Sequence, residues 1–444
     1  MKQILVLGAG LSATILIDYL LKQAEIYDWF IVLADIDEKL AQKKIKDHPR
    51  GMAQAFDVAD SSALDNLLNK KDVVVSLLPA RYHDSIAAAC LEKGIHMATA
   101  SYVSPAIKLM EDEIKAKNLT FLNELGVDPG IDHMSAMRVI DKIRQKGGQL
   151  ASFYSFTGGL IAPESDNNPW HYKFTWNPRN VVVAGQGVSQ FIKNGKYKYI
   201  PYHQLFNRIL EREVLEYGKF EIYPNRDSLK YRKIYQLDNI PTIFRGTMRR
   251  PGYAAAWNVF VQLGCTDDTY IIEESESMTY REFINTFLRY DPGKPVEEKI
   301  VDYLNLDSGG EVMQKLKWLG IFDNRKIELK NASPAQILQK LLTEKWALDP
   351  GDKDMIVMQH EFEYELDDTM YQITSSMVYI GKSTTETAMA ITVGTPLAIA
   401  VKLLLTGQIQ QQGVIIPTKP ELYNPILNEL ESYGMKFVEK ELIV

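Results

Sequence analysis

The start of the chain combines a short apolar run, a glycine-containing turn and an amphipathic segment, and this order constrains the fold most strongly. Residues 3–7 are typical of a buried strand, and residues 14–22 repeat apolar side chains at helical spacing. Gly8 permits a tight turn, Gly10 lets the backbone approach a pyrophosphate, and Ala13 allows close packing of helix on strand. Phosphate oxygens would bind the N–H groups at the positive end of that helix. The expected contacts in this turn are Gly8, Gly10, Leu11, Ser12 and Ala13.

A second predicted strand, residues 29–37, carries Asp35 at its carboxyl end, 25 residues after Gly10. A carboxylate at this place binds the adenine ribose hydroxyls and disfavours a 2′-phosphate, which indicates NAD in preference to NADP. Lysines on the next helix keep NADP open, namely Lys39, Lys43 and Lys44. The alternative role for Asp35 is to cap that helix.

Four more strands are predicted before residue 126. The third ends near Asp57, the fourth spans residues 73–77, and the fifth and sixth lie in residues 95–105 and 119–126. Strands alternating with helices at this spacing predict an α/β fold with a Rossmann-type, doubly wound parallel sheet. Ligands of such sheets bind at the carboxyl ends of the strands.

The pattern changes after residue 150. Residues 151–164 and 172–185 are rich in β-branched and aromatic side chains, and residues 354–381 alternate and turn at 367–369, which predicts a hairpin. Residues 360–365 alternate between aromatic or histidine and glutamate, and we expect the glutamates to form a solvated face rather than a metal site. Segments between 265 and 348 have the apolar spacing of helices. We therefore expect an α/β substrate domain with a mixed or antiparallel sheet and a helical insert.

These patterns predict three regions along the chain. Residues 1–125 with about 385–444 would form a discontinuous dinucleotide-binding domain. Residues 126–264 and 349–384 would form the substrate-binding and dimerisation domain, and 265–348 the insert.

Composition excludes several classes of partner. The net charge of −7 gives no basic field for nucleic acid or an anionic membrane. The chain opens without a signal-peptide cleavage region, and the apolar run 395–405 is too short for a bilayer and contains Lys402. Cys90 and Cys265 have no metal-type spacing and fit a reducing compartment. A cytoplasmic protein acting on a small molecule is expected.

The stretch NELGVDPGIDHMSAM, residues 123–137, gathers Glu124, Asp128, Asp132 and His133. Such a group is compatible with a catalytic centre, a metal site or a polar loop. Because the stretch follows the sixth strand, it lies at the ligand-binding edge of the sheet. We expect Asp128 to face the substrate, Asp132 and His133 to cap and orient the next helix, and no metal to bind.

Arginines form two groups in the second half. Arg226 lies in residues 223–228, and Arg245, Arg249 and Arg250 lie in residues 243–253. The planar guanidinium pairs with both oxygens of a carboxylate, so these groups are candidates for holding a substrate with carboxylates.

Six blocks, in order, resemble the L-glutamate-forming saccharopine dehydrogenases, also called saccharopine reductases. They are SLLPARYH, TASYVSP, ELGVDPGIDHMSAM, YPNRDS, RGTMRRPGY and TVGTPLAIAVKLLLTGQI, and they cover nearly the whole chain. The resemblance implies a Rossmann-type domain completed by the C-terminal segment, an α/β substrate domain and a helical insert. It also implies oxidation of saccharopine by NAD(P)+ to an imine, followed by hydrolysis to L-glutamate and 2-aminoadipate 6-semialdehyde, or the reverse condensation, in lysine metabolism.

The resemblance also implies site residues by position. The substrate contacts would be Ser101, Tyr102, Asp128, Arg226, Thr247, Met248 and Arg249. The cofactor contacts would include, besides the glycine turn, Asp35, Asp57, Leu77, Leu125, Gly126, Val127, Asp128, Pro129, Gly130, Ile131, Asp132, His133 and Met134.

The proposed chemistry explains these residue types. The arginines match the carboxylates of saccharopine, and Asp128 and Tyr102 are the catalytic candidates for holding the amine and moving its protons. One departure is Thr157, because family members commonly carry a cysteine before the following glycines. A thiol role there is excluded in this chain.

Two other functions compete. A carboxynorspermidine dehydrogenase-like imine reductase would act on a substrate with fewer carboxylates and more amines, and would favour acids where Arg226 and Arg249 stand. A non-catalytic nucleotide-binding protein would be expected to lose Asp128 or the arginines. A homodimer is the default assembly.

Overall fold

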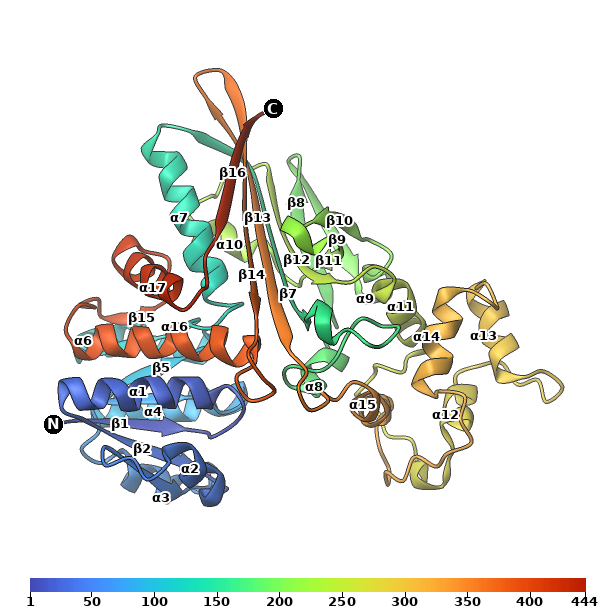
Figure 1. The fold of residues 1–444 in the computed structure, drawn as a ribbon, viewed down its shortest axis with the longest axis horizontal. Helices are drawn as coiled ribbons and strands as arrows, with labels where there is room; N and C mark the ends of the chain where they lie inside the picture. Colours follow the sequence, from blue (N-terminus) through green and yellow to red (C-terminus); the bar gives the residue numbers. More distant parts are fainter. The chain divides into compact units, whose positions relative to one another are not determined.

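The computed structural model describes residues 1–444, apart from the side chain of Ser61, and the chain forms two compact units (Figure 1). Unit 1 comprises Met1–Gly148 and Met377–Val438, and unit 2 comprises Gln149–Ser376 and Glu439–Val444. The division differs from the expected domains in placing residues 126–148 and 377–384 in unit 1 and residues 439–444 in unit 2.

Unit 1 is built on a parallel sheet of seven strands in the order β15-β6-β5-β4-β1-β2-β3. The six predicted strands are present: β1 (Lys2–Leu7), β2 (Trp29–Asp35), β3 (Gly51–Ala55), β4 (Val73–Ser76), β5 (His96–Thr99) and β6 (Thr120–Leu122). The predicted doubly wound parallel sheet is thereby confirmed. The seventh strand, β15 (Gly413–Ile415), comes from the C-terminal segment and was not predicted, because three residues show no periodicity.

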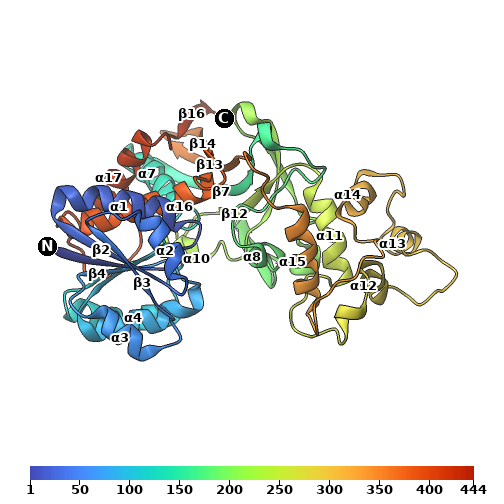
Figure 2. The same ribbon diagram turned by 60° about the horizontal axis from the view of Figure 1, so that its bottom comes forward.

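Helices cover both faces of this sheet. Figure 2 shows α1 and α16 side by side on one face and α3 and α4 on the other. The helices of unit 1 are α1 (Ala13–Tyr27), α2 (Glu38–Ile45), α3 (Ser61–Leu68), α4 (His83–Lys93), α5 (Pro105–Leu109), α6 (Glu111–Ala116), α7 (Ile131–Gln145), α16 (Ala388–Leu405) and α17 (Pro420–Ser432). One layer of the core packs under α3 and α4, with fully buried Leu5, Val74, Ile86 and Cys90.

Helix α7 packs on the C-terminal helix α17, and this contact explains why residues 126–148 belong to unit 1. The Tyr423 hydroxyl on α17 donates to Asp141 Oδ2 on α7 at 2.8 Å. Sequence periodicity identifies such a helix but does not identify its packing partner, which lies almost 300 residues away in the chain.

Helix α16 lies against α1, and Gly394 makes this approach close. A Cβ at Gly394 would lie 2.9 Å from the Ser12 carbonyl oxygen, so a larger residue would push α16 away from the glycine turn. By length and composition α16 would be long enough to span a membrane, but 83% of it is buried inside the structure. It is longer than the expected apolar run 395–405, and its burial identifies it as a core helix of unit 1.

Unit 2 is built on a mixed sheet of nine strands. Along the main path the order is β10-β11-β12-β7-β13-β14-β16, and β8 joins β12 and β9. Strands β7 and β12 are parallel, whereas β7 and β13, and β11 and β12, are antiparallel. The strands are β7 (Gln149–Ile161), β8 (Val188–Lys193), β9 (Lys196–Pro201), β10 (Leu210–Glu213), β11 (Lys219–Pro224), β12 (Thr242–Arg249), β13 (Asp354–Leu366), β14 (Thr369–Ile380) and β16 (Val438–Ile443). The predicted hairpin is β13–β14.

The predicted helical region is present between β12 and β13. Its helices α12 and α15 begin with capping boxes, Thr279 with Glu282 and Ser333 with Gln336, which satisfy the first backbone N–H groups. The helices of unit 2 are α8 (Pro178–Val182), α9 (Tyr202–Leu205), α10 (Lys230–Ile234), α11 (Tyr253–Leu263), α12 (Tyr280–Thr286), α13 (Val296–Leu304), α14 (Glu311–Leu319) and α15 (Pro334–Lys345).

Two expectations for unit 2 were wrong. Residues 178–182 form helix α8 rather than a strand, because Asn177 caps the Arg179 N–H and Pro178 occupies the first helical position. The glutamates of residues 360–365 are not all solvated, because Glu361 is buried and its Oε1 pairs with Arg212 Nε at 2.7 Å.

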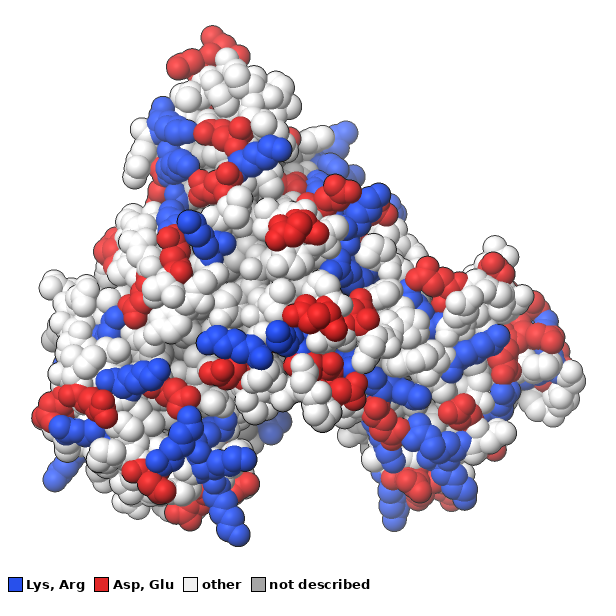
Figure 3. All heavy atoms as spheres, in the orientation of Figure 1, with Lys and Arg blue, Asp and Glu red and all other residues white. Residues whose placement is uncertain are grey.

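The surface carries both signs of charge. Figure 3 shows Lys and Arg interspersed with Asp and Glu over the visible face, in keeping with the net charge of −7.

Candidate active site

The glycine turn of unit 1 has room for a phosphate group. Gly10 is exposed, and apart from Gly10 and its two chain neighbours no residue has an atom within 4 Å of the place where a Cβ would stand. Ser12, at the N-cap position of α1, makes no side-chain cap hydrogen bond. The first N–H groups of this 15-residue helix and its positive dipole end therefore suit a pyrophosphate.

Asp35, which the sequence predicts to bind the ribose hydroxyls, lies at the carboxyl end of β2. Its Oδ2 accepts the Ala9 N–H at 2.6 Å and its Oδ1 accepts the Asp37 N–H at 2.9 Å, so the carboxylate joins the ends of β1 and β2. Asp37, not Asp35, caps helix α2. The alternative role of Asp35 as that cap is wrong.

Three lysines on helix α2 were the reason to consider NADP as the cofactor. Among the described residues, Lys44 is the one of the three whose side chain makes a hydrogen bond. Its Nζ donates to Thr14 Oγ1 on α1, and burial lowers its pKa. Lys39 and Lys43 are exposed.

The ends of β3, β4 and β5 carry the next predicted contacts. Asp57 is exposed and accepts the Ala59 N–H, and Leu77 is partly exposed, with its N–H bonded to the Leu7 carbonyl. Ser101 follows β5, and its Oγ lies 2.9 Å from Nε2 of the buried His83. Burial lowers the pKa of His83, so at neutral pH the neutral imidazole bonds Ser101.

Tyr102 and Asp128 are brought together at the carboxyl edge of this sheet. The Tyr102 hydroxyl donates to Asp128 Oδ1 at 3.2 Å, and Tyr102 is 39% exposed. The other predicted contacts of the loop 125–134 are buried. The Asp128 side chain alone in this loop is partly open to solvent, which makes it the one of the four titratable groups able to meet a substrate.

The remaining three titratable groups of this stretch bond inside unit 1. Glu124 Oε2 lies 2.7 Å from His133 Nε2, with both side chains buried. Asp132 is buried and its Oδ1 accepts the Gly130 N–H at 2.6 Å. Gly130 has φ +148° and a Cβ there would lie 2.1 Å from the Gly126 carbonyl oxygen, so only glycine fits this turn. The N-cap position of α7 is Gly130 and carries no side-chain cap hydrogen bond, so the expectation that Asp132 and His133 cap this helix was wrong. Asp132 bonds the turn at the start of α7, and His133 pairs with Glu124.

In unit 2, Thr157, Thr247 and Arg249 lie on one face of the sheet. Thr157 on β7 is the register partner of Thr247 on β12, which in turn is opposite Tyr223 on β11. Arg249, two residues after Thr247, lies on the same face. Met248 points to the opposite face and is fully buried.

Arg249 is enclosed by tyrosine rings. Its guanidinium carbon lies 5.0 Å from the Tyr172 ring centroid, 5.8 Å from Tyr223 and 5.3 Å from Tyr253, and the side chain is buried. Nη1 donates to the Met248 carbonyl, while the buried Nε has no hydrogen-bond partner among the described residues. Stacking on aromatic faces is a known use of arginine, and here it stabilises a buried cation.

Arg226 differs from Arg249 in its exposure and in its backbone conformation. It is exposed, its backbone is in the left-handed region with φ +40°, and its carbonyl accepts the Gln190 N–H. A side chain on such a turn is available to a carboxylate ligand. Arg245 is buried, with its guanidinium 4.1 Å from the Tyr231 ring centroid, so it is not comparably available.

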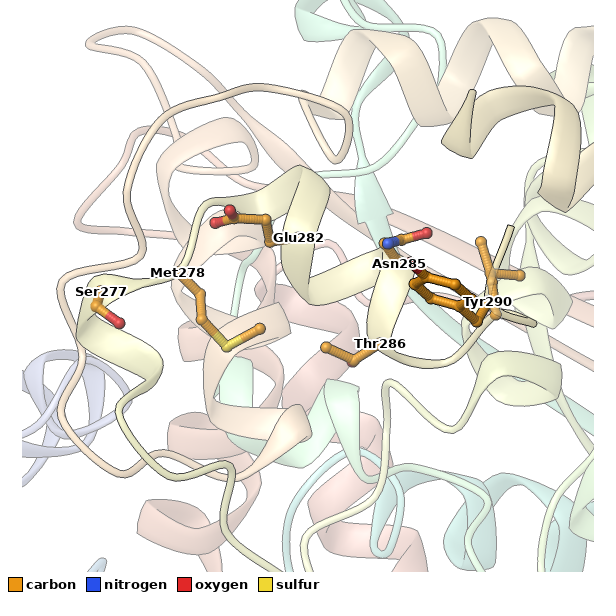
Figure 4. A pocket seen from close by; sticks show the side chains of 7 residues that line it. Ser277, Met278, Glu282, Asn285, Thr286 and Tyr290 are labelled. Atoms are coloured by element: carbon orange, nitrogen blue, oxygen red, sulfur yellow. The ribbon is translucent and has the colours of Figure 1, made fainter. Parts of the chain in front are cut away.

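A pocket in the helical region is unrelated to these residues. Figure 4 shows its lining, which includes Met278, Glu282, Asn285 and Tyr290. Glu282 belongs to the capping box of α12, and Asn285 accepts from Lys299. Its polar groups thus have structural roles. Among the described residues no three His, Cys, Asp or Glu side chains are grouped as metal ligands.

Sequence reasoning missed two features of the site. The tyrosines around Arg249 come from separate elements, and only the strand register of Tyr223 carried a signal. His83 lies inside the quoted block SLLPARYH, but a histidine at the start of a helix gives no indication of its serine partner across the sheet edge.

Comparison with known proteins decides the family. The family described as "Saccharopine dehydrogenase NADP binding domain" matches residues 4–122, and the one described as "Saccharopine dehydrogenase C-terminal domain" matches residues 126–435. The chain is 32% identical over 453 residues to the NADP(+)-dependent, L-glutamate-forming saccharopine dehydrogenase of Schizosaccharomyces pombe, covering 100% of this chain and 99% of that protein.

The chain belongs to the saccharopine dehydrogenase family.

A solved structure agrees. The apo saccharopine dehydrogenase (L-Glu forming) of Saccharomyces cerevisiae superposes with a TM-score of 0.89 at 32% identity over the whole of both chains. This likeness confirms the predicted fold class, a Rossmann-type unit with an α/β unit built on a mixed sheet.

The homospermidine synthase of Legionella pneumophila, solved with NAD, has a TM-score of 0.55 at 10% identity, which is a likeness of fold alone. The comparisons therefore favour the saccharopine dehydrogenase interpretation over the polyamine alternative.

Proposed function

We propose that this protein oxidises saccharopine with a nicotinamide dinucleotide and water to L-glutamate and 2-aminoadipate 6-semialdehyde, releasing the reduced dinucleotide and a proton, as part of lysine metabolism. The full-length kinship with saccharopine dehydrogenases supports the substrate. The observation that carries the proposal is the Tyr102–Asp128 pair at the carboxyl edge of the unit 1 sheet. The bound nicotinamide would supply the hydride acceptor.

Asp128 has the chemistry to hold the substrate amine. The secondary amine is largely protonated at neutral pH and must lose this proton before oxidation. A partly exposed carboxylate can pair with the cation and accept its proton, and the Tyr102 hydroxyl, already bonded to Oδ1, can then donate toward the nitrogen that departs when the carbinolamine collapses. The two groups together would serve both the oxidation and the hydrolysis.

Arg226 is proposed as the main carboxylate ligand. It is exposed on a turn and has no side-chain partner among the described residues, so its five donors are available. Thr247 would add a hydroxyl. Arg249 would act through the tyrosines that enclose it, shaping this face of the sheet rather than binding the substrate by its guanidinium.

For the cofactor we propose NAD in preference to NADP. Asp35 at the end of β2 and Asp37 and Glu38 directly after it place three carboxylates within four residues, and no arginine lies among them. A 2′-phosphate there would meet like charge, while Asp35 suits ribose hydroxyls. The relatives and the matching domain carry NADP in their names, so the comparison of the two cofactors is a direct test.

The test is a set of parallel assays on the purified protein. Saccharopine with NAD+ should produce reduced cofactor with a higher kcat/KM than with NADP+. Carboxynorspermidine precursors with reduced cofactor serve as the polyamine arm. Absence of saccharopine-dependent reduction with both cofactors would refute the proposed function, and turnover in the polyamine arm would replace it.

A homodimer and a cytoplasmic location stay predictions. Both cysteines are buried free thiols, which suits a reducing compartment. Size-exclusion chromatography with light scattering, and fractionation of the source cells, would test the two predictions.

A further inference from the structure

Glu124 combines two unfavourable features at one position. Its carboxylate is 95% buried by side-chain exposure, and its backbone has φ +58°, in the left-handed region that non-glycine residues rarely adopt. A residue of this kind is retained only where its surroundings hold it firmly, and such positions concentrate at functional sites.

The bonds of Glu124 bracket Tyr102. Its backbone N–H donates to the Ser101 carbonyl at 3.0 Å, and its Oε1 accepts the Val103 N–H at 3.1 Å. The residues immediately before and after Tyr102 are therefore both bonded to one residue on the neighbouring strand end.

The other carboxylate oxygen closes the loop that carries Asp128. Glu124 Oε2 lies 2.7 Å from Nε2 of His133, which is fully buried in the first turn of α7. Between them the loop is folded on itself, with the Gly126 N–H bonded to the Pro129 carbonyl at 2.8 Å and the Ile131 N–H bonded to the Gly126 carbonyl at 2.9 Å. One carboxylate thus connects the backbone around Tyr102 to the base of the Asp128 loop.

We propose that the buried Glu124–His133 pair is a positioning element that holds the Tyr102 hydroxyl within hydrogen-bond distance of Asp128 during the reaction. The proposal rests on the functions proposed for Tyr102 and Asp128. Neither Glu124 nor His133 contacts the substrate, because both are buried; they act through the two backbone segments that they join. A merely structural pair would stabilise unit 1 without setting the Tyr102–Asp128 geometry.

The experiment compares Glu124→Ala and Glu124→Gln with a matched control in the same unit. Glu429→Ala removes another carboxylate with two partners, because Glu429 accepts from Lys402 and from the Tyr19 hydroxyl, and none of these residues lies in 99–134. Each variant is measured for steady-state kinetics with saccharopine, for dinucleotide affinity, for thermal stability, and for hydrogen exchange of peptides covering 100–104 and 125–131. If Glu124→Ala does not fold, His133→Ala takes its place.

For Glu124→Ala we expect kcat to fall about 100-fold, the effect of misplacing a reacting group by about 1 Å. Hydrogen exchange should rise in both peptides, and the measured dinucleotide affinity separates a loss of cofactor binding from the loss of kcat. Glu124→Gln should recover most of kcat, because its amide oxygen still accepts the Val103 N–H. In a Tyr102→Phe background the loss from Glu124→Ala should shrink, since the positioned hydroxyl is already gone. Glu429→Ala should lose thermal stability and keep the wild-type kcat and the wild-type exchange of both peptides.

Unchanged exchange in the two peptides, or raised exchange with wild-type kcat, would overturn the positioning proposal, as would equal loss of kcat in Glu429→Ala. An undiminished effect of Glu124→Ala in the Tyr102→Phe background would also overturn it. If the wild-type protein does not oxidise saccharopine, the proposed function fails, and the exchange of the same peptides still decides whether Glu124 holds the two segments.

Discussion

The two regions that carry the predicted site residues hold them in opposite ways. In unit 1 the one partly exposed acid, Asp128, stands on a loop whose other polar groups are bonded to each other. In unit 2 the more deeply held arginine, Arg249, is enclosed by three tyrosines, while Arg226 is exposed on a turn. In unit 1 the hydrogen bonds among the other polar groups of the loop leave the Asp128 carboxylate accessible to solvent. In unit 2 the packing of aromatic rings buries the Arg249 guanidinium. Arginine is therefore expected to have different roles at positions 226 and 249.

The strongest test of unit 1 is Asp128→Asn. Removing the acid–base group should lower kcat by about 10²–10⁴-fold, the usual contribution of a positioned proton-transfer group. Steady-state assays with saccharopine measure the loss. Asp112→Asn, at an exposed carboxylate on α6, is the control and should leave kcat unchanged. Wild-type kcat in Asp128→Asn would remove Asp128 from the mechanism.

The strongest test of unit 2 is Arg249→Ala. Loss of the buried guanidinium leaves a cavity among three rings, so we expect the free energy of unfolding to fall by about 3 kcal/mol. Denaturant unfolding followed by tryptophan fluorescence measures the change. Arg226→Ala should change this free energy by less than about 0.5 kcal/mol, because the side chain is exposed. Equal stability losses in the two variants would contradict the distinction drawn between the two arginines.

Substrate binding should depend more on Arg226 than on Arg249, which is the reverse of the order expected for stability. Arg226→Ala should raise KM for saccharopine by about 10–100-fold, corresponding to the loss of a charged hydrogen-bonded contact of about 1.5–3 kcal/mol. The assay is the saccharopine dependence of the initial rate at saturating cofactor. Arg208→Ala, at another exposed arginine of unit 2, should leave KM unchanged.

Cofactor preference tests the ribose end of unit 1. Asp35→Ser combined with Ile36→Arg replaces a carboxylate and adds a guanidinium after β2. We expect the ratio of kcat/KM for NADP+ to that for NAD+ to rise about tenfold, the equivalent of one contact of about 1.4 kcal/mol. Asp35→Ser alone measures the effect of removing the repulsion between the carboxylate and the 2′-phosphate. The difference between the single and the double variant measures the attraction by the new guanidinium. A ratio that does not move would show that the 2′-phosphate lies elsewhere.

The smallest expected effect concerns His83. Burial lowers its pKa below the ordinary 6.5, against an opposing attraction from Asp84. In the window from 6.5 down to the folded-state pKa the unfolded chain binds more protons, so the stability that neutral His83 provides is lost as pH falls. As the pH is lowered through this window, the wild-type protein should lose more unfolding free energy than His83→Gln, as denaturant unfolding at a series of pH values would show. His203→Gln, at an exposed histidine, should follow the wild-type profile.

Local patterns were sufficient for much of the fold. The six strands of unit 1, the hairpin β13–β14 and the helical region were all predicted, because each depends on apolar periodicity and on turn residues within a short window. Prediction failed where a local feature or a distant partner outweighed this periodicity. Asn177 and Pro178 turned a β-rich run into α8, and β15 is a strand only because β6 lies beside it.

The candidate site divides in the same way. That an acid, a phenol and several arginines serve a carboxylate-rich amine substrate was implied by motifs in the sequence. Which acid of residues 124–133 is available was decided by the pairing of Glu124 with His133 and by the bond of Asp132 to Gly130. The sequence by itself determined the elements and the residue types, because periodicity and turn chemistry act within a few residues. The exposure of Asp128 and the burial of Arg249 were decided only by the tertiary structure, because each depends on which side chains fold against it, among them Tyr102 and Tyr172 from other elements of the chain.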